Sequence, residues 1–267
     1  MKIYSHSIQG KRPHNEDEHY TYDFNTVNIL SKKIPATIIA VFDGHGGKTV
    51  SYALKKNLIN FIFSNISIDD LHKSSRTIDK VFKIYNMMHQ KLILDYPRII
   101  KNCGSTACVL IRYLNKDNKP RLWVFNVGDS RVIKCNKADL AEQLSNDHKP
   151  SNPSEKERIE SLGGIIKFDG ADWRIQDLSV SRAFGDISST PYITHLPEIY
   201  RYKLSKDDKF IIMACDGLWD VLSNQDATDF VLHLLKSNYK GDISEALVNH
   251  AYKSGSTDNI TAIVMLL

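Results

Sequence analysis

The segment Ala36-Thr-Ile-Ile-Ala-Val-Phe42 is followed directly by Asp43-Gly44-His45-Gly46-Gly47. The first part is rich in Ile, Val and Phe, as buried strands are, and the second has the Asp and Gly of a turn. A carboxylate beside so apolar a strand is costly to bury unless it is paired. The combination recurs, because Asp129 and Asp216 each follow another apolar run. The ends of these strands are therefore the first place to look for function.

Seven runs have this apolar strand character and are bounded by Gly, Asn, Asp or Pro. They cover residues 3–8, 36–42, 106–113, 121–127, 131–135, 209–215 and 260–267. Residues 115–120, between the third and fourth runs, predict a hairpin turn. The strands cluster in hairpin-like pairs and do not alternate regularly with helices, which favours antiparallel sheets.

Helical periodicity is found in fewer segments. Apolar residues recur at three- and four-residue steps in residues 49–63 and 78–94. Residues 153–162 begin with Pro, and Ser223 and Asp242 each precede an acid by three positions, a pattern typical of helix starts. We expect an α+β fold with antiparallel sheets and helices packed outside. No repeat or Gly/Ser-rich linker is present, so residues 1–267 are predicted to form a single domain.

Composition and charge exclude several classes of protein. The 267 residues are 42% hydrophobic and 25% charged, which is ordinary for a globular protein. The net charge of +4 is mild and basic doublets such as Lys32–Lys33 are scattered, so no nucleic acid is expected to bind. No apolar stretch is long enough to cross a membrane. Four cysteines without disulfide or zinc spacing, and no signal peptide, favour an intracellular protein, cytoplasmic or nuclear. The protein is also expected to be a monomer.

The acids at turns are the informative residues. A single Asp-Gly after a strand is usually only a turn, so the functional interpretation depends on several acids gathering at one end of the sheets. Such acids repel one another unless cations neutralise them, and Mg²⁺ or Mn²⁺ prefer oxygen ligands of this kind. The candidates are Asp43, Asp129, Asp216 and Asp258, together with Arg12, Glu16 and Asp17 in one loop after the first strand.

The sequence lacks the motifs of several other classes of hydrolase and phosphate-binding protein. A cysteine phosphatase needs Arg six positions after its Cys, but those four positions hold Val109, Leu114, Ala141 and Val221. No nucleophile elbow and no Walker A loop is present. A two-metal hydrolase remains, in which a water activated by two cations displaces the leaving group in line. Arg12 suits bidentate binding of the phosphoryl group.

Nine motifs in order along the chain resemble those of the metal-dependent serine/threonine phosphatases called protein phosphatase type 2C. They are Gly10-x-Arg12 with Glu16-Asp17, Asp43-Gly44-His45-Gly46-Gly47, Gly104-Ser-Thr106-Ala107, Gly128-Asp129-Ser130-Arg131, Asp147-His148-Lys149-Pro150, Gly163-Gly164, Ser181-Arg182-Ala-Phe-Gly185-Asp186, Asp216-Gly217-Leu-Trp219-Asp220 and Ser256-Thr-Asp258-Asn259. This resemblance implies a four-layer α-β-β-α sandwich of two antiparallel sheets. It also implies a phosphoric monoester hydrolase that acts on phosphoserine and phosphothreonine in proteins.

The resemblance implies a set of metal ligands. Asp43 would bridge two ions, Mn²⁺ or Mg²⁺. Glu16 and the Gly44 carbonyl would hold one of these ions, while Asp216 and Asp258 would hold the other.

It implies further roles around that ligand set. Asp17 would orient the attacking water, and Arg12 would bind the substrate phosphate. His45 would act as the general acid that protonates the leaving alkoxide. Asp129, with Asp216, matches a weaker third-metal site that some members have.

Simpler interpretations of the same residues remain open. Arg12 beside Glu16 is also compatible with a surface ion pair, and His45 with an exposed turn residue. The role of Asp220 is open, and the motifs at 147–150 and 181–186 are interpreted as scaffold. Residues 168–179 fall in the flap region that varies most in the family. Asn15 stands where many members carry Met, which makes the entering loop more polar.

Two rival functions fit less well. Dinuclear metallophosphoesterases share an Asp-x-His and a Gly-Asp motif, but their Gly-Asn-His is absent, because Asn249-His250 follows Val248. A pseudophosphatase that only binds partners predicts lost metal carboxylates, whereas Glu16, Asp43, Asp216 and Asp258 are all present. Phosphorylated proteins are therefore the expected partners.

Overall fold

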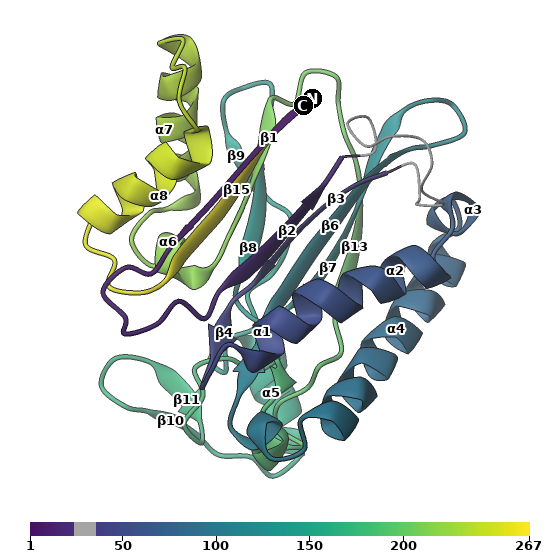
Figure 1. Cartoon of the computed structure of the whole chain (residues 1–267), viewed down its shortest axis with the longest axis vertical. Helices are drawn as coiled ribbons and strands as arrows, with labels where there is room; N and C mark the ends of the chain where they lie inside the picture. Colours follow the sequence, from purple (N-terminus) through teal and green to yellow (C-terminus); the bar gives the residue numbers. More distant parts are fainter. Residues whose placement is uncertain (24–35) are drawn as a thin grey trace.

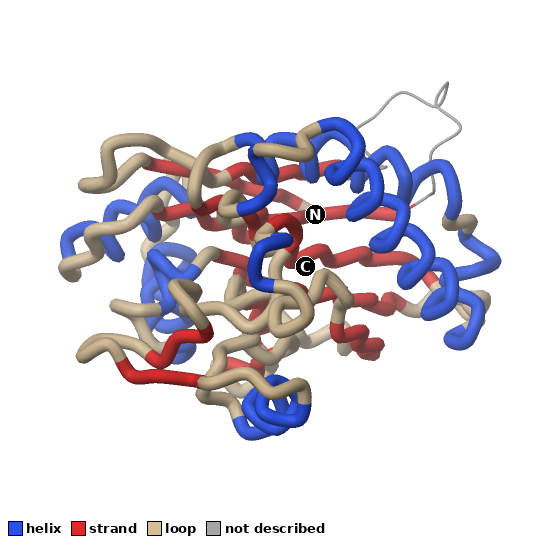
Figure 2. Tube along the Cα trace, turned by 90° about the horizontal axis from the view of Figure 1, so that it is seen from below, coloured by secondary structure: helices blue, strands red, loops and turns tan. Residues whose placement is uncertain are grey.

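The computed structural model describes residues 1–23 and 36–267. Two antiparallel sheets lie face to face, and helices cover the outer face of each (Figure 1). Figure 2 shows the same order from below, with the strands in the middle and helices outside. The α+β fold and its four-layer α-β-β-α arrangement are confirmed. The doublet Lys32–Lys33 lies outside the described residues.

The first sheet is covered by the N-terminal helices. Its strands are β2 (Glu18–Tyr22), β3 (Ala36–Phe42), β6 (Ala107–Leu114), β7 (Pro120–Val127) and β13 (Glu198–Lys203), in the order β13-β7-β6-β3-β2. The helices are α1 (Thr49–Ala53), the π-helical turn η1 (Leu54–Leu58), α2 (Ile59–Asn65), α3 (Ile68–Leu71) and α4 (Ser74–Asp95). α4 buries Val81, Tyr85, Met88 and Leu92, which three- and four-residue steps place on one side of a helix.

The second sheet is covered by the C-terminal helices. Its strands are β1 (Lys2–Ile8), β8 (Arg131–Cys135), β9 (Ala141–Gln143), β14 (Phe210–Ala214) and β15 (Ile260–Leu266), in the order β1-β15-β14-β8-β9. The helices are α6 (Asp216–Trp219), α7 (Asn224–Lys236) and α8 (Ile243–Lys253). β1 pairs with β15 over its whole length, so the two ends of the chain lie side by side (Figure 1).

Both faces of the central strands are buried, which explains their continuous apolar sequence. In β6, Val109 and Ile111 pack under the helices, whereas Leu110 points into the core between the sheets. In β14, Ile212 packs toward α7 and α8, whereas Met213 points into that same shared core. This period-two alternation divides each strand between an outer core and the inner core.

Short elements close the end of the sandwich where β3, β7 and β14 finish. A small sheet holds β4 (Gly44–His45), β5 (Gly104–Ser105) and β12 (Phe184–Gly185). A hairpin of β10 (Ile166–Phe168) and β11 (Trp173–Ile175) lies beside α5 (Pro153–Ser161) in the lower part of Figure 1. Single 3₁₀ turns complete this end, η2 (Ile99–Lys101) and η3 (Ile187–Ser189).

The predicted elements agree closely with the structure. Each of the seven predicted strands is present, with ends that differ by at most one residue. Ser223 and Asp226 form the expected capping box of α7, and Asp242 accepts from the backbone of Glu245 in α8. The helix predicted at 49–63 contains the π-helical turn η1, from which Lys55 reaches Glu18 of β2 across 2.6 Å.

Both outer strands of the first sheet were missed by the sequence analysis. β2 and β13 lie at its two edges and alternate apolar with polar residues. An edge strand is partly exposed and needs no continuous apolar run. Among the helices of the described residues, none has the length and apolar character needed to cross a bilayer.

The inner core can be tested at one strand. Leu110 of β6 is fully buried between the sheets, whereas Leu114 on the same strand is 42% exposed. We expect Leu110→Ala to lower the free energy of unfolding by about 2–5 kcal/mol, because it leaves a cavity. The matched Leu114→Ala should cost less than about 1 kcal/mol. Urea denaturation measures both, and equal losses would contradict the assignment of Leu110 to the shared core.

Candidate active site

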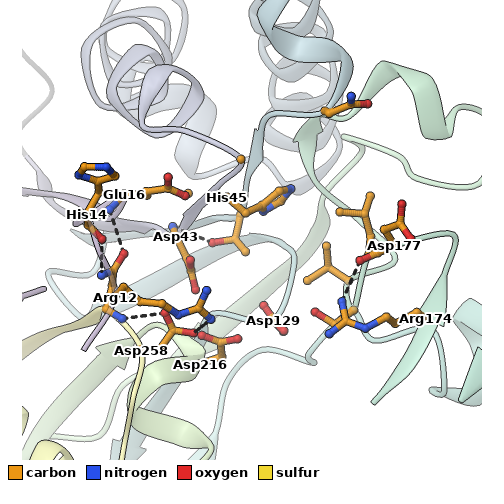
Figure 3. A pocket seen from close by; sticks show the side chains of 18 of the residues that line it. Arg12, His14, Glu16, Asp43, His45, Asp129, Arg174, Asp177, Asp216 and Asp258 are labelled. Carbon is orange, nitrogen blue, oxygen red and sulfur yellow. Dashed lines mark hydrogen bonds and ion pairs between the residues drawn. The ribbon is translucent and has the colours of Figure 1, made fainter. Parts of the chain in front are cut away.

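A cavity of about 420 Å³ opens at the end where β1, β3, β7 and β14 finish. In antiparallel sheets, alternate strands end and begin at the same edge. Asp43 after β3 and Asp129 after β7 thereby meet Asp216 after β14 and Asp258 before β15, and all four line the cavity (Figure 3). Arg12, Glu16, Gly44 and His45 line it too. The fold therefore brings the sequence-predicted acids together.

Two groups of side chains are close enough to share an ion. Carboxylate oxygens of Asp43, Asp129 and Asp216 lie within 4.8 Å of one another. Asp43 also lies within that distance of Asp17 and the Cys215 thiol. Glu16 and Asp258 line the same cavity but belong to neither group in the described part of the chain.

The electrostatics of this cluster are unfavourable for bare carboxylates. Burial and the charges of Asp216, Asp17 and Asp129 hold the pKa of Asp43 well above its usual range. Burial, followed by the charge of Asp216, likewise raises the pKa of Asp129. Burial raises the pKa of Asp216 to about 6, with Asp220 and Asp258 adding to the effect. The cluster therefore favours a positive charge in its midst.

Glu16 is placed by contacts between its backbone and distant segments. Its N–H donates to Asn259 Oδ1 over 2.9 Å, and its carbonyl accepts from Ser51 Oγ over 2.5 Å. The Asn259 amide also donates to the Gln9 and His14 carbonyls, so one residue closes the loop. Gly44 packs so tightly here that a Cβ would lie 2.4 Å from the Glu16 carbonyl oxygen. The motif at residues 256–259 predicted no role for Asn259, which the structure shows to hold this loop.

Asp17 is buried beside the cluster. Its Oδ2 accepts from Thr261 Oγ1 over 2.6 Å, and its N–H donates to Asn15 Oδ1 over 3.1 Å. Asn15 therefore fastens the loop by a polar contact. Burial raises the pKa of Asp17 to about 7, against the hydrogen bond from Thr261, and the charges of Asp216 and Asp258 raise it further.

Arg12 is paired with a metal-ligand candidate. Its Nη2 lies 2.6 Å from Asp258 Oδ2, while the Asp258 Oδ1 accepts from the Asn259 N–H over 2.7 Å. The alternative pair of Arg12 with Glu16 is not found among the described residues. The guanidinium is 57% exposed at the cavity wall, so it can contact a bound ligand (Figure 3).

His45 is held by a buried carboxylate and is not a free turn residue. Its Nε2 lies 2.6 Å from Oδ2 of Asp186, which is 2% exposed, while the imidazole is 30% exposed to the cavity. The small sheet creates this pair, because Gly104 pairs with His45 on one side and Gly185 on the other. A Cβ at Gly104 would lie 2.0 Å from the Asp186 oxygen. Asp186 was interpreted from the sequence only as scaffold.

Two buried carboxylate oxygens indicate whether the acidic residues of the cavity are suited to bind a cation. Asp17 Oδ1 and Asp129 Oδ2 are buried and accept no hydrogen bond in the described structure. A buried carboxylate oxygen without a partner is costly. Cations bound by oxygen ligands satisfy such atoms, so the donor set fits divalent cations. The molecule therefore belongs to the class of antiparallel α-β-β-α sandwiches with a candidate divalent-cation centre at one end of the sheets.

Known proteins have sequences similar to this one over nearly all its length. Residues 1–260 match the family described as protein phosphatase 2C. The chain is 33% identical to protein phosphatase 1L of Bos taurus, over 97% of this chain and 71% of that protein. It is 38% identical to a probable protein phosphatase 2C of Arabidopsis thaliana, over 97% of this chain but only 64% of that protein. A mimivirus protein with a protein phosphatase 2C-like domain is 42% identical over 57% of this chain and 97% of its own length.

Solved structures agree on the fold. A serine-threonine phosphatase 2C from Toxoplasma gondii superposes with a TM-score of 0.82 at 21% identity, covering 99% of this chain and 94% of that one. The chain belongs to the protein phosphatase 2C family, and it is by that membership a protein phosphatase.

The raised pKa of Asp17 predicts a pH effect in chelated protein. A folded-state pKa of about 7, against an unfolded value near 3.8, means that the folded state keeps a proton which the unfolded state releases. Stability from this group therefore falls as pH rises from about 4 to 7. We expect the free energy of unfolding of Asp17→Asn to rise relative to that of wild type over that interval, by on the order of 2–4 kcal/mol. Denaturant unfolding at several pH values measures this, and a constant difference would contradict it.

Proposed function

We propose that this protein hydrolyses phosphoserine and phosphothreonine in proteins by means of two divalent cations, Mn²⁺ or Mg²⁺. Asp43 would hold both ions, Glu16 and the Gly44 carbonyl one of them, and Asp216 with Asp258 the other. Asp129 with Asp216 would hold a weaker third. The bound ions supply an activated water for in-line attack and neutralise charge on the phosphoryl group.

The residues around the cluster have separate tasks in this proposal. The exposed Arg12 guanidinium at the cavity wall binds phosphoryl oxygens, with Asp258 fixing its orientation. Asp17 accepts a hydrogen bond from the attacking water through Oδ1, the oxygen left without a protein partner. His45 protonates the leaving alkoxide. Since Asp186 engages Nε2, the proton to be transferred resides on Nδ1.

One observation carries the proposal. Carboxylate oxygens from three sequence-distant strand ends lie within 4.8 Å of one another at the bottom of a solvent-reached cavity. Like charges at this separation are disfavoured without a counter-charge. A pseudophosphatase has no need for such an arrangement, since binding a partner requires no unneutralised carboxylates. The metallophosphoesterase alternative is wrong, because the chain belongs to another family.

The first experiment tests the activity itself. We expect purified protein to release phosphate from a phosphothreonine peptide with Mn²⁺ or Mg²⁺, and not with chelator. Asp216→Asn should lower the rate by about 100-fold or more, because it removes a charged ligand. The matched control is Asp229→Asn, an exposed residue of α7, which should keep wild-type activity. Folded protein that releases no phosphate at any metal concentration would favour the pseudophosphatase.

The general acid is tested by changing the leaving group. We expect His45→Gln to slow hydrolysis of a phosphothreonine peptide by roughly 10²–10⁴-fold. Hydrolysis of p-nitrophenyl phosphate should slow much less, because p-nitrophenolate is a good leaving group without a proton. Steady-state rates with both substrates are compared at saturating Mn²⁺. Equal losses on the two substrates would show that His45 does not donate the proton.

A further inference from the structure

Lys149 places a positive charge beside the acidic cluster. Its Nζ lies 3.7 Å from Asp129 Oδ2 and 3.8 Å from Asp220 Oδ1. The lysine side chain is 24% exposed, and Asp129 is 2% exposed. Asp220 was left without a role by the sequence analysis, and Lys149 was interpreted as scaffold. The two residues meet only in the folded protein.

The backbone holds Lys149 firmly in this position. His148 donates its N–H to the Gly128 carbonyl over 3.0 Å, and the Gly128 N–H donates to His148 Nδ1 over 3.1 Å. The Lys149 carbonyl accepts from the Asn152 N–H over 3.0 Å. Because Gly128 and His148 directly precede Asp129 and Lys149, these bonds set the two charged residues side by side.

The ammonium group, by contrast, is held loosely. Its distances of 3.7 and 3.8 Å exceed hydrogen-bond range, and the buried Asp129 Oδ2 accepts no hydrogen bond in the described structure. Some other lysines make close contacts with acids, such as Lys55 with Glu18 at 2.6 Å. Lys149 therefore interacts by charge without a directed bond, as an exchangeable counter-ion does.

The charges around Lys149 also support its interpretation as a counter-ion. A lysine ammonium carries a positive charge at neutral pH, and carboxylate oxygens of Asp129 and Asp220 lie 3.7 and 3.8 Å from it. Lys149 is therefore a fixed positive charge beside these two acids. Asp129 also belongs to the carboxylate group with Asp43 and Asp216, so Lys149 neutralises one side of the proposed metal centre.

We propose that Lys149 is a tethered counter-cation of Asp129 and Asp220, and that it competes with a third divalent cation for these carboxylates. This inference rests on the proposed function for the existence of the cation centre. A third ion must displace the ammonium from Asp129 Oδ2 or bind against its charge. In either case Lys149 sets how weakly that ion binds, and thus the cation concentration at which the site fills.

Binding of Mn²⁺ to the whole chain tests this directly, without turnover. Free Mn²⁺ is measured by electron paramagnetic resonance during titration, and calorimetry gives the stepwise constants. We expect Lys149→Met to tighten the weakest binding step about tenfold, equivalent to about 1.4 kcal/mol. The binding constants of the two tighter steps should change by less than about threefold, since those ions do not use Asp129 or Asp220, the carboxylates that Lys149 faces.

Matched variants separate competition from a general charge effect. Lys149→Arg keeps the charge and should keep the weak binding of wild type. Lys156→Met removes the same charge from α5, where Lys156 faces Glu160 at 3.8 Å, and should leave all steps unchanged. If both Met variants tightened the weakest step equally, the proposal would be overturned. An unchanged or weakened step in Lys149→Met, or no third ion in any variant, would overturn it as well.

A double variant assigns the ion to these residues. Adding Asp220→Asn to Lys149→Met should remove the tenfold gain, and persistence of the gain would contradict a site at Asp220. Thermal unfolding of each variant confirms that it is folded, and Lys149→Gln replaces Lys149→Met if that variant does not fold. Since the readout is Mn²⁺ binding, absence of phosphatase activity would count against the proposed function without affecting this result.

Discussion

Repulsion between carboxylates at one end of the sandwich is the constraint on which the rest of the structure depends. Asp43, Asp129 and Asp216 are brought within 4.8 Å by strands that are largely apolar. Such a cluster lowers stability unless positive charge enters it. The surrounding fold must therefore supply enough burial to hold the acids together. The inner core between the sheets and the two outer cores provide that burial.

The backbone around the cluster is fixed by neutral polar contacts. Thr106 accepts from the Asp43 N–H over 3.0 Å, Ser51 and Asn259 hold Glu16, and Thr261 donates to Asp17. These contacts use none of the outward carboxylate oxygens at Asp17 Oδ1 and Asp129 Oδ2. The ligand atoms are thus oriented while their lone pairs stay free, which is the preorganisation that a cation centre requires.

The chain also supplies part of the counter-charge itself. Arg12 faces Asp258 at the cavity (Figure 3), and Lys149 faces Asp129 and Asp220. Both side chains are partly exposed to solvent. In the proposed mechanism Arg12 exchanges its carboxylate for phosphoryl oxygens, and Lys149 yields its carboxylates to a cation. The electrostatic balance of the site would then be shared between these two side chains and bound ions.

The sequence by itself determined seven strands, six of them inside the sheets and β1 at an edge, together with the main helices and the acids at the strand ends. Local patterns suffice there, because a strand buried on both faces needs an unbroken apolar run and its turn needs Asp or Gly. Only the tertiary structure decided the edge strands β2 and β13, the pairing of Arg12 with Asp258 across 246 positions, and that of His45 with Asp186 across 141. The place of Lys149 between Asp129 and Asp220 was decided in the same way. These contacts join residues whose own neighbours in the chain carry no trace of the partner, so no local pattern encodes them.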